Sequence, residues 1–240
     1  MARRGLADSR EIAQRLIMAG RVRVNSRPAY KPDLKVDSAT LIDLMAGAPQ
    51  FASRGAYKLI AALENFGISV EGRLAMDVGA STGGFTDVLL RRGAKGVIAM
   101  DVGYGQLLLK LRENPRVTVL DRMNIRLASP TDLPFAPEVV TIDTSFISLR
   151  LVIPAVLTLV APRAEIIALI KPQFEVGKGK VGKGGVVKDE KLRRDAVAGI
   201  VDFATSVGLG VVGTVESPIE GAAGNREFLA FMKYPAASAR

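Results

Sequence analysis

The segment best suited to chemistry is a glycine-rich turn, Asp77-Val78-Gly79-Ala80-Ser81-Thr82-Gly83-Gly84-Phe85. It follows a predicted strand and precedes a predicted helix, which is where open α/β sheets bind nucleotides. Glycines in such a turn let the backbone approach a ligand closely. The spacing is G-x-x-x-G-G, which matches neither the dinucleotide fingerprint G-x-G-x-x-G nor the phosphate-binding loop G-x-x-x-x-G-K-[ST].

Two acidic residues narrow the choice of ligand. Asp77 ends the strand before the turn, where a carboxylate would repel a pyrophosphate but could help hold the cationic amino-acid part of S-adenosylmethionine. Asp101 ends the next predicted strand, where an acid can accept hydrogen bonds from ribose hydroxyls. Together they favour S-adenosylmethionine over NAD as the cofactor. A glycine-rich turn without a ligand is the alternative.

Four further charged residues lie beside apolar segments far apart in the sequence: Lys58, Asp143, Lys171 and Glu227. Asp143 and Lys171 close predicted strands, and the carboxyl ends of parallel strands face the ligand crevice. Taken singly, each of the four is more often an ion-pair partner or a solvated loop charge.

Missing residue types restrict the chemistry. The sequence has no cysteine and no histidine, which excludes disulfides, thiolate or imidazole metal ligands, a cysteine nucleophile and a Ser-His triad. Acid–base work therefore falls to Asp, Glu, Lys or Tyr, and no metal is expected. A chain without disulfides suits the reducing cytoplasm, so we expect a cytoplasmic protein.

The elements that must position these residues alternate between strand and helix from residue 56 onward. Strands are predicted at residues 74–77, 97–101, 117–120, 139–143, 164–170, 210–216 and 228–232. Helices are predicted at about residues 56–66, from the glycine turn to 92, around 107–111, and at 151–159 and 190–206. This alternation predicts an α/β fold of the Rossmann-like type, with a mostly parallel sheet and helices on both faces.

The N-terminal quarter is strongly basic. The whole chain has 33 Lys and Arg against 24 Asp and Glu, a net charge of +9, and residues 1–58 hold eleven basic and five acidic residues, or +6 of it. Asp8 and Ser9 can cap a helix running to about Ala19, and strands are predicted at 22–24 and 41–44. A small α+β unit with this charge predicts a nucleic-acid partner, with an ordinary solvated basic face as the alternative.

A membrane is a poor partner for this sequence. The most apolar stretch, residues 151–162, has twelve residues and contains Pro154, whereas a spanning helix needs about 20. A second cationic segment, residues 177–185, has five glycines and three lysines. It could clamp RNA phosphates over the site, or it could be a surface loop without that role.

The chain resembles the TlyA family of hemolysin-named 2′-O-ribose RNA methyltransferases, whose catalytic body is of the FtsJ/RrmJ type. The resemblance covers nearly the whole chain and rests on five segments in family order: SRGAYKL, MDVGASTGGFTD, DTSFISL, LIKPQFE and GNREFL. It implies an S-adenosylmethionine-dependent enzyme whose N-terminal unit resembles the RNA-binding domain of ribosomal protein S-four. The expected partners are ribosomal RNA or ribosomal subunits.

By position, the resemblance makes Lys58, Asp143, Lys171 and Glu227 the catalytic tetrad. Lys171 would be either the base that removes the ribose hydroxyl proton or a donor that orients the ribose. The resemblance and the motifs give a cofactor-binding set of Asp77, Gly79, Ser81, Thr82, Gly83, Gly84, Phe85, Asp101, Met123 and Asp143. The basic candidates for RNA contact are Arg3, Arg4, Arg10, Arg15, Arg21, Arg23, Arg54, Lys178, Lys180 and Lys183.

The expected domains are an RNA-binding unit at 1–46, a linker at 47–53 and a methyltransferase domain at 54–235. Family members begin with further residues ahead of the first helix, so we expect the RNA-binding unit here to lack its usual first residues. Two other functions remain open: an RNA- or ribosome-binding protein that has kept the fold without the activity, and a hemolysin.

Overall fold

The structure is a computed structural model of the 240-residue chain. It describes residues 1–7, 9–18, 21–25, 27–29, 32–37, 39–44, 51–177, 179–182, 184–221 and 223–235. Part of the predicted linker, residues 45–50, lies outside these ranges, as do Asp8 and Ala19 at the predicted ends of the first helix.

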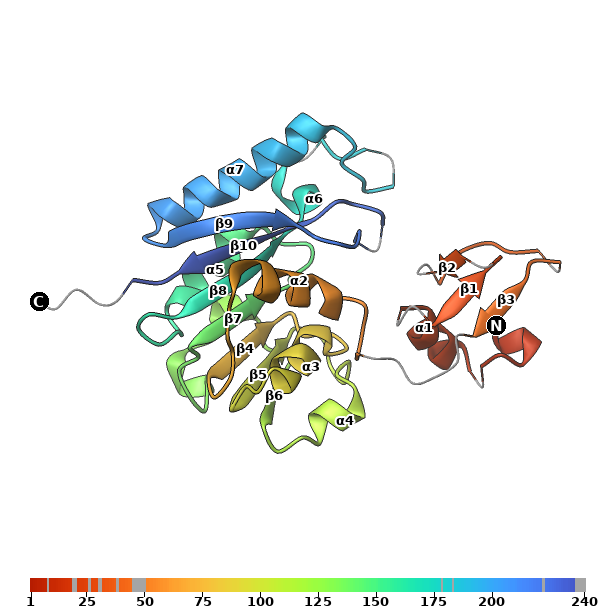
Figure 1. Cartoon of the computed structure of the whole chain (residues 1–240), viewed down its shortest axis with the longest axis horizontal. Helices are drawn as coiled ribbons and strands as arrows, with labels where there is room; N and C mark the ends of the chain where they lie inside the picture. Colours follow the sequence, from red (N-terminus) through yellow and green to blue (C-terminus); the bar gives the residue numbers. More distant parts are fainter. Residues whose placement is uncertain are drawn as a thin grey trace, which may run out of the picture.

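The N-terminal unit is a short helix with a small antiparallel sheet (Figure 1). Its elements are the 3₁₀ turn Ala2–Arg4, α1 (Arg10–Met18), β1 (Val22–Val24), β2 (Arg27–Ala29) and β3 (Ile42–Leu44), with strand order β2-β1-β3. The Ile12 backbone N–H donates to Ser9 Oγ at 3.1 Å, so Ser9 caps α1 as predicted. Strand β2 was not predicted.

The main body is built on one seven-stranded sheet with order β6-β5-β4-β7-β8-β10-β9. The strands are β4 (Leu74–Val78), β5 (Gly96–Asp101), β6 (Val117–Asp121), β7 (Val139–Ile142), β8 (Glu165–Ile170), β9 (Gly210–Glu216) and β10 (Phe228–Lys233). All neighbours from β6 to β8 are parallel, and β10 runs antiparallel to both β8 and β9. The predicted mostly parallel sheet is confirmed, with each strand within two residues of its predicted bounds.

Helices cover both faces of this sheet (Figure 1). They are α2 (Ala56–Phe66), α3 (Gly84–Arg91), α4 (Leu109–Arg112), α5 (Leu149–Leu157), α6 (Pro172–Glu175) and α7 (Glu190–Ser206). One buried cluster joins α2 and α3 to the sheet through residues such as Leu59 and Leu89, and a second joins α5 and α7 through Ile153 and Ile200. The two clusters make a three-layer α/β sandwich, which is the predicted fold class.

The strand order reverses beside β4, because the chain fills β5 and β6 on one side before crossing to β7 on the other. Ligand crevices of open α/β sheets lie at such a reversal, outside the carboxyl ends of the strands. The turns after β4, β5 and β7 therefore meet at one edge, with the end of β8 beside them. In the parts of the chain that the structure describes, no helix has the length and hydropathy to cross a membrane.

Candidate active site

Lys171 lies directly after β8 and is held by two oxygen atoms. Its Nζ is 2.6 Å from Asp143 Oδ1 and donates a hydrogen bond to Ser145 Oγ at 3.0 Å. Lys171 is 8% exposed, whereas the Asp143 side chain is 24% exposed. An ammonium group has three donors, so these two contacts fix the rotation of Nζ and leave one position for a further partner.

Lys58 and Glu227 form a second and more deeply buried pair. Lys58 Nζ lies 2.5 Å from Glu227 Oε2, and the two residues are 7% and 3% exposed. Gly221 makes room for the carboxylate, because a Cβ at Gly221 would lie 2.2 Å from Glu227 Oε1.

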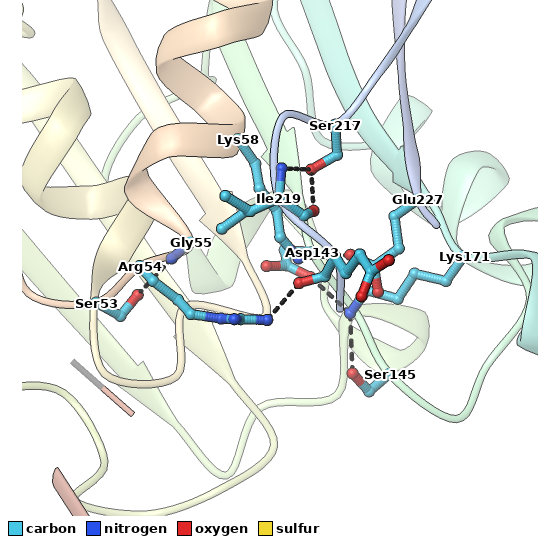
Figure 2. A network of polar contacts seen from close by, with 11 residues as sticks. Ser53, Arg54, Gly55, Lys58, Asp143, Ser145, Lys171, Ser217, Ile219 and Glu227 are labelled. Atoms are coloured by element: carbon cyan, nitrogen blue, oxygen red, sulfur yellow. Dashed lines mark hydrogen bonds and ion pairs between the residues drawn. The ribbon is translucent and has the colours of Figure 1, made fainter. Parts of the chain in front are cut away.

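Figure 2 shows the four side chains pointing toward one another from α2, the turn after β7, the residue after β8 and the residue before β10. Burying an isolated charge is costly, and a paired opposite charge offsets much of that cost. With two lysines and two carboxylates, the cluster is neutral when all four groups are ionised. The carboxylate paired with Lys58 also offsets the repulsion that this lysine would exert on Lys171.

The glycine turn contacts Asp143 through the backbone. Gly79 has φ +86°, and a Cβ there would lie 2.5 Å from the Asp143 carbonyl oxygen. The Asp143 N–H donates to Val78 O at 2.9 Å, so the turn and the carboxylate-bearing loop are joined on two sides. Glycine at 79 is therefore required for both its backbone conformation and the close approach.

Asp101 is held in place by the same turn. Its Oδ2 accepts from the Ser81 N–H at 2.8 Å, and its Oδ1 accepts from the Gly103 N–H at 2.7 Å. These bonds fix the carboxylate at the carboxyl end of β5, where a ribose acid was predicted.

Two cavities share Gly79 in their lining. The larger, about 410 Å³, is lined by residues that include Asp101, Met123 and Asn124. The smaller, about 210 Å³, includes Asp77 and Phe85. Gly79, Ser81 and Asp143 line both cavities. A fixed acid in the larger cavity suits a nucleoside, and the smaller one leads from the glycine turn to Asp143, so the residues present fit S-adenosylmethionine.

Asp77 is fully buried and hydrogen-bonded by two hydroxyls. Thr86 Oγ1 donates to Asp77 Oδ2 at 2.7 Å, and Thr141 Oγ1 donates to Asp77 Oδ1 at 3.1 Å. Burial raises the pKa of Asp77 to about 7, with the Asp143 charge adding to the rise and the Thr86 hydrogen bond opposing it. The side chain ties β4 to α3 and β7, and the role of Asp77 in holding the cofactor stays a prediction.

The other predicted cofactor residues divide into two groups. Thr82, Gly84 and Phe85 line the smaller cavity. Gly83 instead is the N-cap residue of α3, with φ +97°, and a Cβ there would lie 2.3 Å from Leu111 Cδ1. This geometry gives Gly83 a packing reason of its own to be glycine.

The predicted RNA contacts are spread over the chain. Arg3, Arg4, Arg10, Arg23 and Lys180 are exposed, and Arg21 is half-buried. Arg54 donates to the Glu220 carbonyl and lines the smaller cavity, so it lies beside the cluster. The Arg15 side chain, Lys178 and Lys183 are outside the described part of the chain.

The sequence analysis missed Ser145, Gly221 and Asn225. Ser145 lies two residues after Asp143 and bonds to Lys171. Asn225 is 2% exposed and bonds to residues 185 and 187, far away in the sequence. Ser145 lies in the segment DTSFISL, Asn225 lies in GNREFL, and Gly221 lies three residues before GNREFL. Their closeness in sequence to the tetrad residues is the signal that could have found them.

Comparisons with known proteins match the two parts of the chain separately. Residues 51–234 match the model of the FtsJ-like methyltransferases, and residues 1–42 match the S4 domain. The chain is 47% identical to the 16S/23S rRNA (cytidine-2′-O)-methyltransferase TlyA of Mycobacterium tuberculosis, over 97% of this chain and 87% of the relative. It is 44% identical to YqxC of Bacillus subtilis, over 98% and 84%. A solved structure of a Streptococcus thermophilus protein with a hemolysin name shares 41% identity, with TM-score 0.78 over 96% of this chain and 84% of that one.

The buried carboxyl of Asp77 makes stability depend on pH. Its raised pKa, about 7 against 3.8, means that the folded protein holds a proton that the unfolded chain releases. The contribution is fully present below about pH 4 and is lost as pH rises through about 7, a change of up to about 4 kcal/mol. Asp77→Asn removes this titration, so the variant gains free energy of unfolding relative to the wild type between about pH 5 and pH 8.

Urea denaturation at both pH values measures this difference. Asp202→Asn, on the exposed side of α7, is the matched control and should follow the wild-type pH dependence. A wild-type pH dependence in Asp77→Asn would contradict the assignment.

Proposed function

The chain belongs to the FtsJ-like methyltransferase family and carries an S4 domain ahead of the catalytic body, and on that basis we propose that it transfers a methyl group from S-adenosylmethionine to a ribose 2′-hydroxyl of ribosomal RNA. The observation that carries the proposal is the convergence of Lys58, Asp143, Lys171 and Glu227 (Figure 2), with Asp143 packed against the glycine turn. The rRNA (cytidine-2′-O)-methyltransferase activity in the name of the 47% identical relative supports the choice of substrate.

Binding of the cofactor is assigned to the two cavities around Gly79. The Asp101 carboxylate would accept hydrogen bonds from the ribose hydroxyls of the cofactor, and Met123 and Asn124 would lie beside its adenine. The smaller cavity would hold the amino-acid end. S-adenosylmethionine supplies an electrophilic methyl group bonded to a positively charged sulfur.

The residues of the chain then have to orient the 2′-hydroxyl and take its proton. We assign Lys171, in its amine form, as the proton acceptor, because Asp143 and Ser145 already fix the orientation of Nζ. As the proton arrives, the lysine becomes an ammonium, and the carboxylate at 2.6 Å stabilises that charge. Lys58 and Glu227, more deeply buried, would hold the cluster in register beside the ribose.

The division into parts is proposed as an RNA-binding unit at 1–46, a linker at 47–53 and the methyltransferase domain at 54–235. The basic N-terminal unit would bind ribosomal RNA through its exposed arginines, including Arg3, Arg10 and Arg23. The complete tetrad supports catalysis over RNA binding alone.

Replacing Gly79 by Ala should weaken binding of S-adenosylmethionine. The added Cβ would lie 2.5 Å from the Asp143 carbonyl oxygen, so the turn would have to move. If that movement costs about 1.4 kcal/mol of binding free energy, the dissociation constant of the cofactor rises about tenfold. Gly72→Ala is the matched control, because Gly72 also has a positive φ, +71°, but faces open space. The control should lose about 1–2 kcal/mol of stability and keep the cofactor affinity, as measured by calorimetry. Equal affinities for the two variants would sink this cofactor site.

Lys171→Ala should lose methyl transfer while keeping the cofactor affinity. Removing the proton acceptor is expected to lower the single-turnover rate by at least about 100-fold. The measurement is transfer of radiolabelled methyl to ribosomal subunits, with calorimetry for the cofactor. Lys95→Ala, an exposed lysine before β5, is the control. A wild-type rate in the Lys171 variant, or transfer to RNA with a 2′-deoxyribose at the target nucleotide, would refute the assignment.

RNA binding should weaken steeply with salt. Each lysine or arginine that neutralises a phosphate adds about 0.7–0.9 to the slope of log affinity against log salt concentration. Arg23→Ala and Lys180→Ala should each reduce the slope by about that amount, whereas Lys95→Ala should not. Filter binding of ribosomal RNA over a salt series measures the slope, and a flat dependence would argue against a phosphate-bound complex.

A further inference from the structure

Asn225 anchors residues 184–187, at the far end of the loop that contains the cationic segment 177–185. Asn225 Oδ1 accepts from the Val187 N–H at 2.9 Å, and its Nδ2 donates to the Gly185 carbonyl at 2.8 Å. Asn225 and Val187 are each 2% exposed, so the bond between them is removed from water, whereas the bond to the exposed Gly185 is only partly buried. A buried amide whose donor and acceptor are both used is costly to replace, because either partner would be left unsatisfied.

The same residue closes the turn that carries Glu227. The Asn225 carbonyl accepts from the Gly221 N–H at 2.8 Å, and the Gly224 N–H donates to Gly221 O at 2.9 Å. Two residues later, the Glu227 carbonyl accepts from the Ser217 N–H at 2.8 Å. Its carboxylate lies against Gly221 and Lys58. The backbone of Asn225 thus shapes the wall against which the Glu227 carboxylate lies.

The N-terminal end of this loop lies close in sequence to Lys171, which belongs to the other ion pair of the cluster. Helix α6 begins at Pro172, immediately after Lys171, and the Val176 N–H donates to Pro172 O at 3.0 Å. The chain that leads to residues 184–187 therefore leaves directly from Lys171 through α6, and Asn225 holds its other end at the Glu227 turn. Lys180 lies exposed between these two anchors.

We propose that Asn225 is a positioning residue that couples Lys180, through the anchored residues 184–187, to Glu227, so that an RNA phosphate held by Lys180 sets the geometry of the Lys58–Glu227 pair. This inference rests on the proposed methyltransferase function. A displacement of about 1 Å in a positioned catalytic group can lower a rate by about 100-fold. Loss of the Asn225 side-chain bonds is therefore expected to lower kcat, while the cofactor cavities, which Asn225 does not line, keep their affinity.

The experiment compares Asn225→Ala with Asn114→Ala. Asn114 also accepts a backbone N–H, from Arg116 at 2.9 Å, but lies in the turn before β6. Asn225→Ala should lower kcat for methyl transfer to ribosomal subunits by about 10- to 100-fold, with the dissociation constant of S-adenosylmethionine within about twofold of the wild type. Asn114→Ala should match the wild type in both. A wild-type kcat in Asn225→Ala, or a cofactor affinity that falls together with kcat, overturns the proposal.

A double-mutant cycle tests the coupling itself. If the segment acts on Glu227 through Asn225, Lys180→Ala should lower kcat in the wild-type background and have little further effect in Asn225→Ala. Strictly additive losses would contradict the coupling.

A second variant tests the role of the Glu227 turn even if Asn225→Ala fails to fold. Gly221→Ala presses on the Glu227 carboxylate without touching residues 184–187, so it should lower kcat and leave the salt slope of RNA binding unchanged. A wild-type kcat there would contradict the role given to the Glu227 turn. Absence of methyl transfer by the wild-type protein would instead defeat the proposed function, which keeps the two failures distinct.

Discussion

Lys58 and Lys171 are both withdrawn from water, and a carboxylate within 2.6 Å of each nitrogen offsets the cost of a positive charge there. The pairing of each lysine with a carboxylate depends on the direction of the strands in the sheet. Because β10 runs antiparallel to β8, with Phe228 opposite Ile170, the start of one strand lies beside the end of the other. Glu227 and Lys171 are the residues just beyond that pair. Reversing the direction of β10 would move Glu227 to the opposite edge of the sheet and leave Lys58 without its partner.

The backbone contact between Gly79 and Asp143 fixes the position of the ion pairs relative to the glycine turn. The Asp143 carbonyl packs on the glycine turn, and its side chain reaches Lys171. Asp143 therefore contacts both the glycine turn that we assign to the cofactor and Lys171, which we assign to the ribose proton. A methyl transfer between two such sites depends mainly on alignment, and a rigid backbone contact supplies alignment without a metal ion or an imidazole.

The strands and the main helices were predictable because their signals are local. Runs such as Ile166-Ile167-Ala168-Leu169-Ile170 are apolar on both sides, as buried parallel strands require. Strand β2 was missed because Arg27-Pro28-Ala29 has no such pattern. The motif segments placed four charged residues near the crevice, but which carboxylate faces which lysine depends on strand direction and on turns. Ser145, Gly221 and Asn225 lie close to tetrad residues in the sequence, but the contacts that each makes could not be predicted, because the fold brings their partners close.

The two ion pairs differ in access to water, and that difference separates their roles. Glu227 is 3% exposed, whereas the Asp143 side chain is 24% exposed and Ser145 is open to solvent. A ribose can therefore enter on the Asp143 side without breaking the Lys58–Glu227 pair. RNA seated there would displace water from Asp143 and lower the local dielectric, which strengthens its attraction to Lys171. Under the proposed assignment, the charge that Lys171 would gain with the proton would be stabilised most strongly when substrate fills the site. The more exposed pair is therefore the one that we assign to the reaction, and the buried Lys58–Glu227 pair is the one that we assign to positioning.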